Sequence, residues 1–181
     1  MMMVDDPRFA DLVTAMEQTA DARSALHDGS PSQRKLTSNY DRCGLAGEIA
    51  FARKYKLPID LEPRRDGDRG IDFWVPLFMG PGEKALIVSV DVKASANPGH
   101  LLVEPPKAVA DIYVLCRYSG GIMDGELLKW EWGRAVKRAP IKDWYGKPNY
   151  SLKQGELQDM ELLTQMIAVV GVNADIVGRA T

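Results

Sequence analysis

The stretch LIVSVDVKAS, Leu86 to Ser95, is the part of the chain that decides the fold. Apolar and polar residues alternate along it, which predicts a β-strand because successive strand side chains face opposite sides. One face carries Val88, Val90, Val92 and Ala94, and the other carries Ser89, Asp91, Lys93 and Ser95. The polar face either meets water or forms the floor of a catalytic site, and the rest of the sequence must separate these two interpretations.

The length and composition indicate one globular domain. The chain has 181 residues, of which 45% are hydrophobic and 27% charged, and its net charge is −2. A coat for nucleic acid of any sequence is usually basic, so any contact with DNA is expected to be local. Two cysteines and two histidines make a structural zinc site improbable, and Cys116 in the apolar run DIYVLC indicates reduced thiols. Without a signal-like start or a membrane-spanning run, we expect a soluble, cytoplasmic protein.

Periodicity predicts an α/β fold with a mixed central sheet flanked by helices. The predicted helices cover residues 6–29 and 40–57, and the predicted strands cover residues 57–63, 71–77, 85–95, 100–105 and 111–118. A Gly/Pro turn at residues 80–83 favours an antiparallel pair of the strands on either side of it. Beyond Gly121 the pattern weakens to a strand end and a helix over residues 125–141, then a short strand and a helix over residues 150–171.

Three isolated acids and one lysine need a common explanation. Glu48 is the only charge in GLAGEIAFA, Asp72 interrupts the apolar alternation of GIDFWV, and Asp91 shares its strand face with Lys93. If the two strands pair, the carboxylates of Asp72 and Asp91 lie close together and repel one another unless a cation sits between them. Carboxylate oxygens with open water positions suit Mg²⁺ or Mn²⁺ better than zinc.

The order GLAGE, GIDF, VDVKAS resembles the PD-(D/E)XK nuclease superfamily over Gly44 to about Tyr118. The resemblance implies a restriction-endonuclease-like fold in one domain of residues 1–181. It would comprise an N-terminal helix and connector (1–38), a catalytic core (39–120) and a C-terminal α/β extension (121–181). The tail, GELLKWEW to NYSLKQGELQDMELL, is similar to that of small phage-encoded nucleases of this superfamily.

The resemblance also implies a role for each residue. Asp72, Asp91 and the backbone carbonyl of Val92 would bind Mg²⁺ or Mn²⁺, Glu48 would hold the metal or its water shell, and Lys93 would orient the attacking water and offset phosphate charge. The implied activity is hydrolysis of DNA phosphodiesters by a metal-activated water. Endonucleolytic, exonucleolytic and junction-specific cleavage all stay open.

Further residues are candidates for nucleic-acid contacts because they are polar or basic and lie near these motifs: Tyr40, Arg42, Arg64, Arg65, Arg69, Ser95 and His100. For Ser95 and His100 a role in shaping the SANPGH turn is the stronger interpretation. Basic residues around Trp130 and Trp132 could hold a nucleic-acid backbone, but a solvated helix with tryptophans in the core is favoured.

Two other functions are compatible with the sequence. The first is a catalytically inactive nuclease fold that binds DNA or a protein, although the presence of Glu48, Asp72, Asp91 and Lys93 together speaks against it. The second is a nuclease that acts on RNA. Oligomers occur on this scaffold, and the apolar stripe of the first helix could bind a partner or a second copy.

Overall fold

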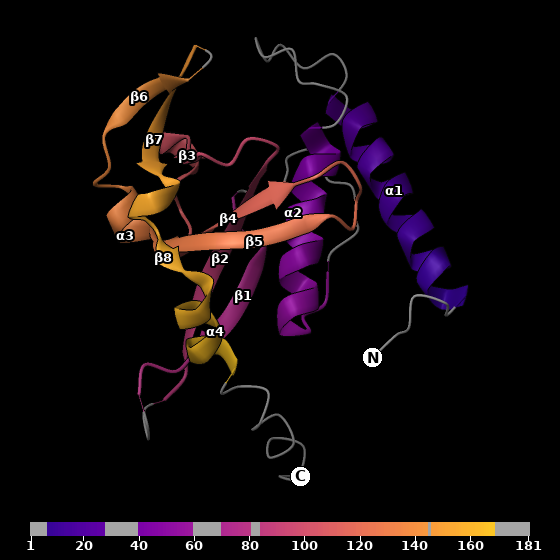
Figure 1. The fold of residues 1–181 in the computed structure, drawn as a ribbon, viewed down its shortest axis with the longest axis horizontal. Coiled ribbons are helices and arrows are strands. Elements are labelled where there is room, and N and C mark those ends of the chain that lie inside the picture. The colour runs from indigo at the N-terminus through magenta and orange to yellow at the C-terminus, as the bar shows by residue number, and fades with distance from the viewer. Residues whose placement is uncertain (1–6, 28–39, 60–69, 81–83, 145, 169–181) are drawn as a thin grey trace. The chain divides into compact units, whose positions relative to one another are not determined.

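The first two predicted helices and the strands predicted over residues 71–118 are present, whereas the order of elements differs from the prediction elsewhere. The structure is a computed structural model that describes residues 7–27, 40–59, 70–80, 84–144 and 146–168 (Figure 1). The helices are α1 (Pro7–His27), α2 (Tyr40–Tyr55), α3 (Gly133–Val136) and α4 (Met160–Ala168), with 3₁₀ turns η1 (Pro105–Lys107) and η2 (Gln154–Glu156). The strands are β1 (Phe73–Leu77), β2 (Leu86–Ser95), β3 (His100–Val103), β4 (Ile112–Tyr118), β5 (Gly125–Trp132), β6 (Ile141–Trp144), β7 (Lys147–Lys153) and β8 (Gln158–Asp159).

The predicted α/β class is confirmed. Five strands form one mixed sheet in the order β1-β2-β4-β5-β8, with helices flanking it. The chain divides into two compact units. The first contains Met1–Arg69, Ala94–Pro98 and Cys116–Leu127, and the second contains Gly70–Lys93, Gly99–Leu115 and Leu128–Thr181. The expectation of a single domain with the three segments given above stays a prediction.

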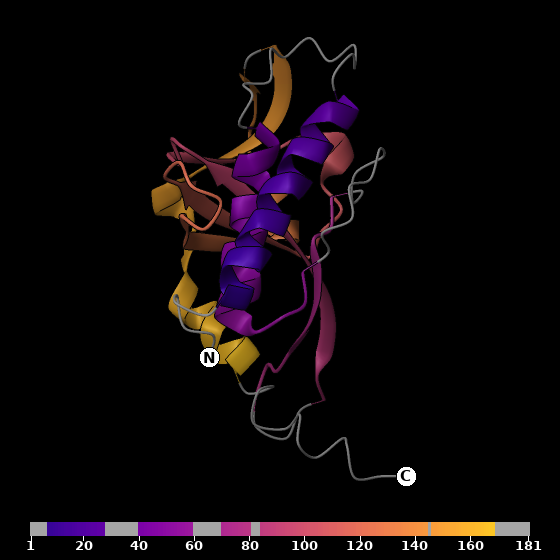
Figure 2. The same cartoon turned by 90° about the vertical axis from the view of Figure 1, so that its right-hand side faces the viewer.

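In the first unit, α1 and α2 lie side by side in both ribbon views (Figures 1 and 2). Met16 and Ala20 of α1 pack with Leu45 and Ile49 of α2 and with Ile122. The described part of the apolar stripe of α1 therefore packs against α2, whereas the sequence alone leaves a partner or a second copy open. Gly125, at the start of β5, allows close packing on α2, because a Cβ there would lie 2.4 Å from the carbonyl oxygen of Ala46.

Helix α2 ends in a left-handed cap, which explains why the strand predicted over residues 57–63 is not found in its described part. Lys56 has φ 56°, and the N–H of Leu57 bonds to the carbonyl of Ala52 at 2.9 Å, as in a Schellman motif. The next residues have no strand conformation, and Ile59 packs on the cluster of Leu45 and Ile49. The remainder of that predicted strand, residues 60–63, lies outside the described residues.

In the second unit, β1 and β2 form the predicted antiparallel pair. Phe73 is opposite Val90, Trp74 opposite Ser89, Val75 opposite Val88 and Pro76 opposite Ile87. Phe73, Val75, Val88 and Val90 are buried, so the apolar face of the predicted alternation is the core face. Strand β1 begins two residues later than the sequence indicates, and this leaves Asp72 immediately before it.

A second sheet of three strands, in the order β3-β7-β6, was not expected. The strand predicted over residues 100–105 joins this sheet, with His100 opposite Lys153 and Val103 opposite Tyr150. Leu101 and Val103 are buried in a cluster with Tyr113 and Leu115 of β4, which gives this pairing its hydrophobic driving force.

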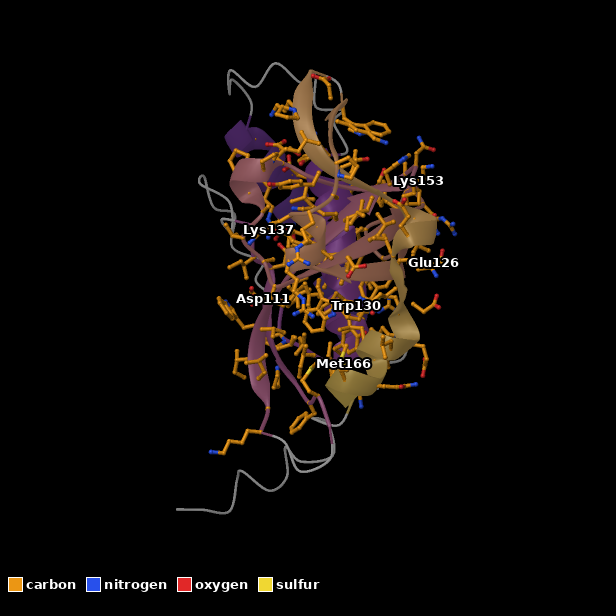
Figure 3. The ribbon with its side chains drawn as sticks, turned by 90° about the vertical axis from the view of Figure 1, so that its left-hand side faces the viewer. Asp111, Glu126, Trp130, Lys137, Lys153 and Met166 are labelled. Carbon is orange, nitrogen blue, oxygen red and sulfur yellow. The ribbon has the colours of Figure 1, made fainter. Side chains whose placement is uncertain are left out.

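Trp130 belongs to β5, which is next to the edge strand β8 of the five-stranded sheet (Figure 3). Its side chain is fully buried, and its indole N–H donates to the carbonyl of Asp159 in β8 at 3.0 Å. At the other edge, the N–H of Phe78 bonds to the carbonyl of Met166 in α4 at 3.2 Å. Among the described residues, no helix is both long enough and apolar enough to cross a bilayer.

Candidate active site

Asp91 is the centre of the candidate site. It lies in the middle of β2, in the second unit, and only 1% of its surface is exposed. The ammonium of Lys93, two residues along the same strand face, lies 2.7 Å from Oδ2 of Asp91, and the lysine side chain is 33% exposed. A buried carboxylate is costly unless a cation or hydrogen bonds compensate its charge. Lys93 supplies one such cation and still reaches solvent.

Asp72 is held against the backbone on both sides of Asp91. Its N–H donates to the carbonyl of Val90 at 2.8 Å, and its Oδ2 accepts from the N–H of Val92 at 2.6 Å. Because the N–H and C=O of one strand residue point toward the same neighbouring strand, the Val92 carbonyl is directed to the side on which Asp72 lies. Asp72 therefore lies beside the strand segment Val90–Val92 that carries Asp91, in the same unit, and their joint role as metal ligands stays a prediction.

Gly70 leaves room beside this group of oxygens. Its φ is +82°, and a Cβ at this position would lie 3.0 Å from the carbonyl of Lys107 and 3.9 Å from Oδ2 of Asp91. A side chain here would be strained by the backbone conformation and would press on the Lys107 carbonyl. The glycine thus allows the chain that leads into Asp72 to run close to Asp91.

Asp111 is a site neighbour that the sequence did not identify. Its Oδ2 accepts from the N–H of Ser89 at 2.9 Å and from Ser89 Oγ at 2.7 Å, and its own N–H donates to Ser89 Oγ at 3.0 Å. These bonds fix the start of β4 against β2 on the face that carries Asp91. In the sequence, Asp111 is only an acid directly before the apolar run IYVLC, and this pattern is equally typical of the end of a turn.

Tyr113 of β4, two residues after Asp111, is fully buried. Its hydroxyl accepts from the N–H of Ala110 at 3.1 Å and donates to the Lys107 carbonyl at 3.5 Å. Burial, with a smaller contribution from the nearby negative charge of Asp91, raises the pKa of Tyr113 to about 12. The hydroxyl therefore stays protonated at physiological pH and supports the loop that precedes β4.

Glu48 belongs to the first unit and has a partner there. Nη1 of Arg23 in α1 lies 2.9 Å from Oε1 and 3.3 Å from Oε2 of Glu48, and the two side chains are 20% and 14% exposed. The ion pair links α1 to α2. It accounts for the one charge in the apolar run GLAGEIAFA of α2 without reference to a metal, so the metal-binding role of Glu48 stays a prediction.

The other predicted contact residues that the structure describes each have their own local surroundings. Tyr40 begins α2 and is 51% exposed, while Arg42 pairs with Glu17 of α1 at 2.5 Å. Ser95 Oγ accepts from the N–H of Asn97 at 3.1 Å, which is the turn-shaping role favoured above. The ring of His100 contacts that of Trp144, with centroids 4.9 Å apart. Arg64, Arg65 and Arg69 lie outside the described residues.

The basic segment around Trp130 and Trp132, residues 129–138, contains both buried and exposed side chains. Trp130 is buried in the sheet, as expected for a core tryptophan, whereas Trp132 is half-buried with the guanidinium of Arg134 5.7 Å from its ring centroid. Lys137 is exposed just after α3 (Figure 3). The helix predicted here is a single turn, because the strand β5 continues to Trp132.

Asp91, Asp72 and the Val92 carbonyl supply oxygen donors of the kind that a small hard cation takes. Within the described ranges, no three His, Cys, Asp or Glu side chains are grouped so that they could hold a metal ion. Mg²⁺, however, is commonly bound by one or two carboxylates and completes its shell with water and substrate phosphate. Two carboxylates and one backbone carbonyl at neighbouring positions are a donor set of that kind.

No protein-family model matches the chain, and no curated protein or solved structure matches it.

Proposed function

We propose that the protein is a metal-dependent nuclease that hydrolyses DNA phosphodiester bonds at the Asp91 site. The observation that carries this proposal is the buried Asp91 carboxylate, which has the Lys93 ammonium 2.7 Å away and Asp72 bound to the adjacent Val92 amide. The resemblance to the PD-(D/E)XK superfamily implies such a set, with one acid and a lysine on a strand and a second acid beside the paired strand.

The chain's own groups have distinct tasks in this reaction. Asp72, Asp91 and the Val92 carbonyl would hold Mg²⁺ or Mn²⁺, and the ion would supply a more acidic water and offset charge on the phosphate. Lys93 is partly exposed and can turn its ammonium from Asp91 toward the attacking water or a phosphate oxygen. Water is the nucleophile, so no covalent intermediate with the enzyme is expected.

The proposed compartment is the cytoplasm. Both cysteines are free thiols, and burial raises the pKa of Cys43 to about 11 and that of Cys116 to about 12. Both thiols therefore stay protonated and unreactive at physiological pH. Free thiols are typical of cytosolic proteins, and this supports the proposed compartment.

The direct test is incubation of the pure protein with plasmid, linear duplex and single-stranded DNA in Mg²⁺, in Mn²⁺ and in chelator. We expect cleavage in either metal and none in chelator. Binding of the DNA without cleavage in any metal would instead identify an inactive binding module. Cleavage of RNA alone would identify the RNA-nuclease alternative.

A pair of variants separates a catalytic role of Glu48 from its structural role. Glu48→Gln and Arg23→Met both break the ion pair between α1 and α2, and each is expected to lower the free energy of unfolding by about 1–3 kcal/mol. Only Glu48→Gln should slow cleavage, by about tenfold or more, because loss of a group in a metal's surroundings costs about 10- to 100-fold. Urea denaturation and initial cleavage rates measure the two effects. Equal cleavage by both variants would make Glu48 a purely structural residue.

A further inference from the structure

An exposed apolar pair lies on the sheet face that carries Asp91. The register places Trp74 opposite Ser89 and Pro76 opposite Ile87, and cross-strand partners share a face. Because Ile87, Ser89 and Asp91 alternate along β2, Trp74 and Ile87 face the same way as Asp91. Trp74 is 63% exposed and Ile87 59%, although Ser89 and Asp91 beside them are buried.

Trp74 and Ile87 are not part of the hydrophobic core of the hairpin. The opposite face of the two strands already supplies the core, through Phe73, Val75, Val88 and Val90. An indole at position 74 leaves most of its apolar surface in water, so burial in the core does not account for it. Exposed aromatic side chains beside a polar site are typical of binding surfaces.

Trp74 and Ile87 lie at the distance from Asp91 that is expected for a nucleotide next to the scissile phosphate. Two residues along a strand span about 7 Å, so Trp74, opposite Ser89, lies about one such step from Asp91. Cations suited to a phosphate backbone lie on β2 and just before it: Lys93 beyond Asp91 is 33% exposed, and Lys84, two residues before β2, is exposed.

We propose that the Trp74–Ile87 surface binds an unpaired base of the substrate next to the scissile phosphate. This inference rests on the proposed nuclease function and names its substrate class: DNA with single-stranded nucleotides at the cut, as in overhangs, flaps and junctions. A base within a continuous duplex has both of its faces covered by stacked neighbours. Only an unstacked base can place a face on the Trp74 indole, with Ile87 packing against the edge of the base or its sugar.

A second copy of the chain is a less suitable occupant of this surface. A dimer interface that extends from Trp74 and Ile87 along this face of β2 would also cover Lys93, and the centres of stable protein interfaces are depleted in lysine. A nucleic acid needs that cation to stay accessible.

The test is binding of fluorescein-labelled oligonucleotides in chelator, where cleavage cannot interfere. The probes are a single strand, a duplex with a single-stranded overhang and the matching blunt duplex, measured by anisotropy. We expect Trp74→Ala to weaken binding of the first two probes about tenfold, the typical effect of losing one stacked base, and to leave the blunt duplex nearly unchanged. Trp74→Phe should retain most of the affinity. Ile141→Ala is the matched control, because Ile141 is 57% exposed but lies in β6, outside the five-stranded sheet.

Three outcomes overturn the inference: wild-type affinity in Trp74→Ala, an equal loss for all three probes, or sedimentation showing that Trp74→Ala converts a dimer into monomers. The failure of the proposed function gives a different result. A protein that cuts nothing in Mg²⁺ or Mn²⁺, yet binds single strands through Trp74, keeps this surface as a site for unpaired bases and loses only the nuclease activity.

Discussion

Asp91→Asn is expected to slow DNA cleavage in Mg²⁺ or Mn²⁺ by more than about 100-fold. Loss of a group in the outer shell of a metal already costs about 10- to 100-fold, and Asp91 is proposed to bind the ion itself. The amide has nearly the size of the carboxylate but no charge, so it cannot offset the charge of a divalent cation. Initial rates on a labelled DNA substrate, at several metal concentrations, measure the effect.

Stability should change little in this variant. The buried amide still offers an oxygen to the Lys93 ammonium, which is 33% exposed and can turn to water. The matched control is Asp159→Asn, which also removes an acid from an acid–lysine pair of the same sheet. Asp159 pairs with Lys129 across β8 and β5, but its side chain is 79% exposed. Cleavage by Asp91→Asn at close to the wild-type rate, with Asp159→Asn also unaffected, would remove Asp91 from the site.

Metal binding gives an independent measurement of the same variant. Calorimetric titration of wild-type protein with Mn²⁺ in the absence of DNA should show binding that Asp91→Asn weakens strongly and Asp159→Asn does not. Unchanged Mn²⁺ affinity in Asp91→Asn would contradict the proposed ligand set even if the cleavage rate fell.

The part of the site that could be predicted from the sequence is the part that depends on strand periodicity. Alternation over Leu86–Ser95 fixed the face of Asp91 and Lys93, and the Gly/Pro turn indicated the antiparallel partner that brings Asp72 to Val92. These relations involve neighbours along a strand or across one turn, where backbone geometry leaves few alternatives.

Contacts between side chains that are far apart in the sequence could not be predicted in this way. The pair of Arg23 and Glu48 and the bonds of Asp111 to Ser89 join residues more than twenty positions apart, and no periodic pattern encodes them. Strand β6 was missed because its four residues, IKDW, are largely exposed and show no alternation. The exposed position of Trp74 was also hidden, since aromatic residues favour strands whether they are buried or not.

Lys93→Ala should slow cleavage about 100-fold without weakening metal binding. The ammonium is proposed to act on the attacking water or the phosphate, and removing one donor of this kind typically costs about 10²–10³ in rate. Lys93 also lies 2.7 Å from Oδ2 of Asp91, where it competes with a metal ion for the same carboxylate. The alanine variant should therefore bind Mn²⁺ as tightly as the wild type or more tightly.

A lower cleavage rate together with an equal or higher Mn²⁺ affinity distinguishes a lysine that takes part in the reaction from a structural counter-ion. Lys93→Arg keeps the positive charge and should retain part of the activity, although its planar guanidinium cannot reproduce the compact ammonium beside Asp91. Lys129→Ala, which breaks the exposed pair with Asp159 on the same sheet, should leave both measurements at their wild-type values. If Lys93→Ala cuts DNA as fast as the wild type, the lysine serves only to balance the buried charge of Asp91, and the chemistry proposed for it fails.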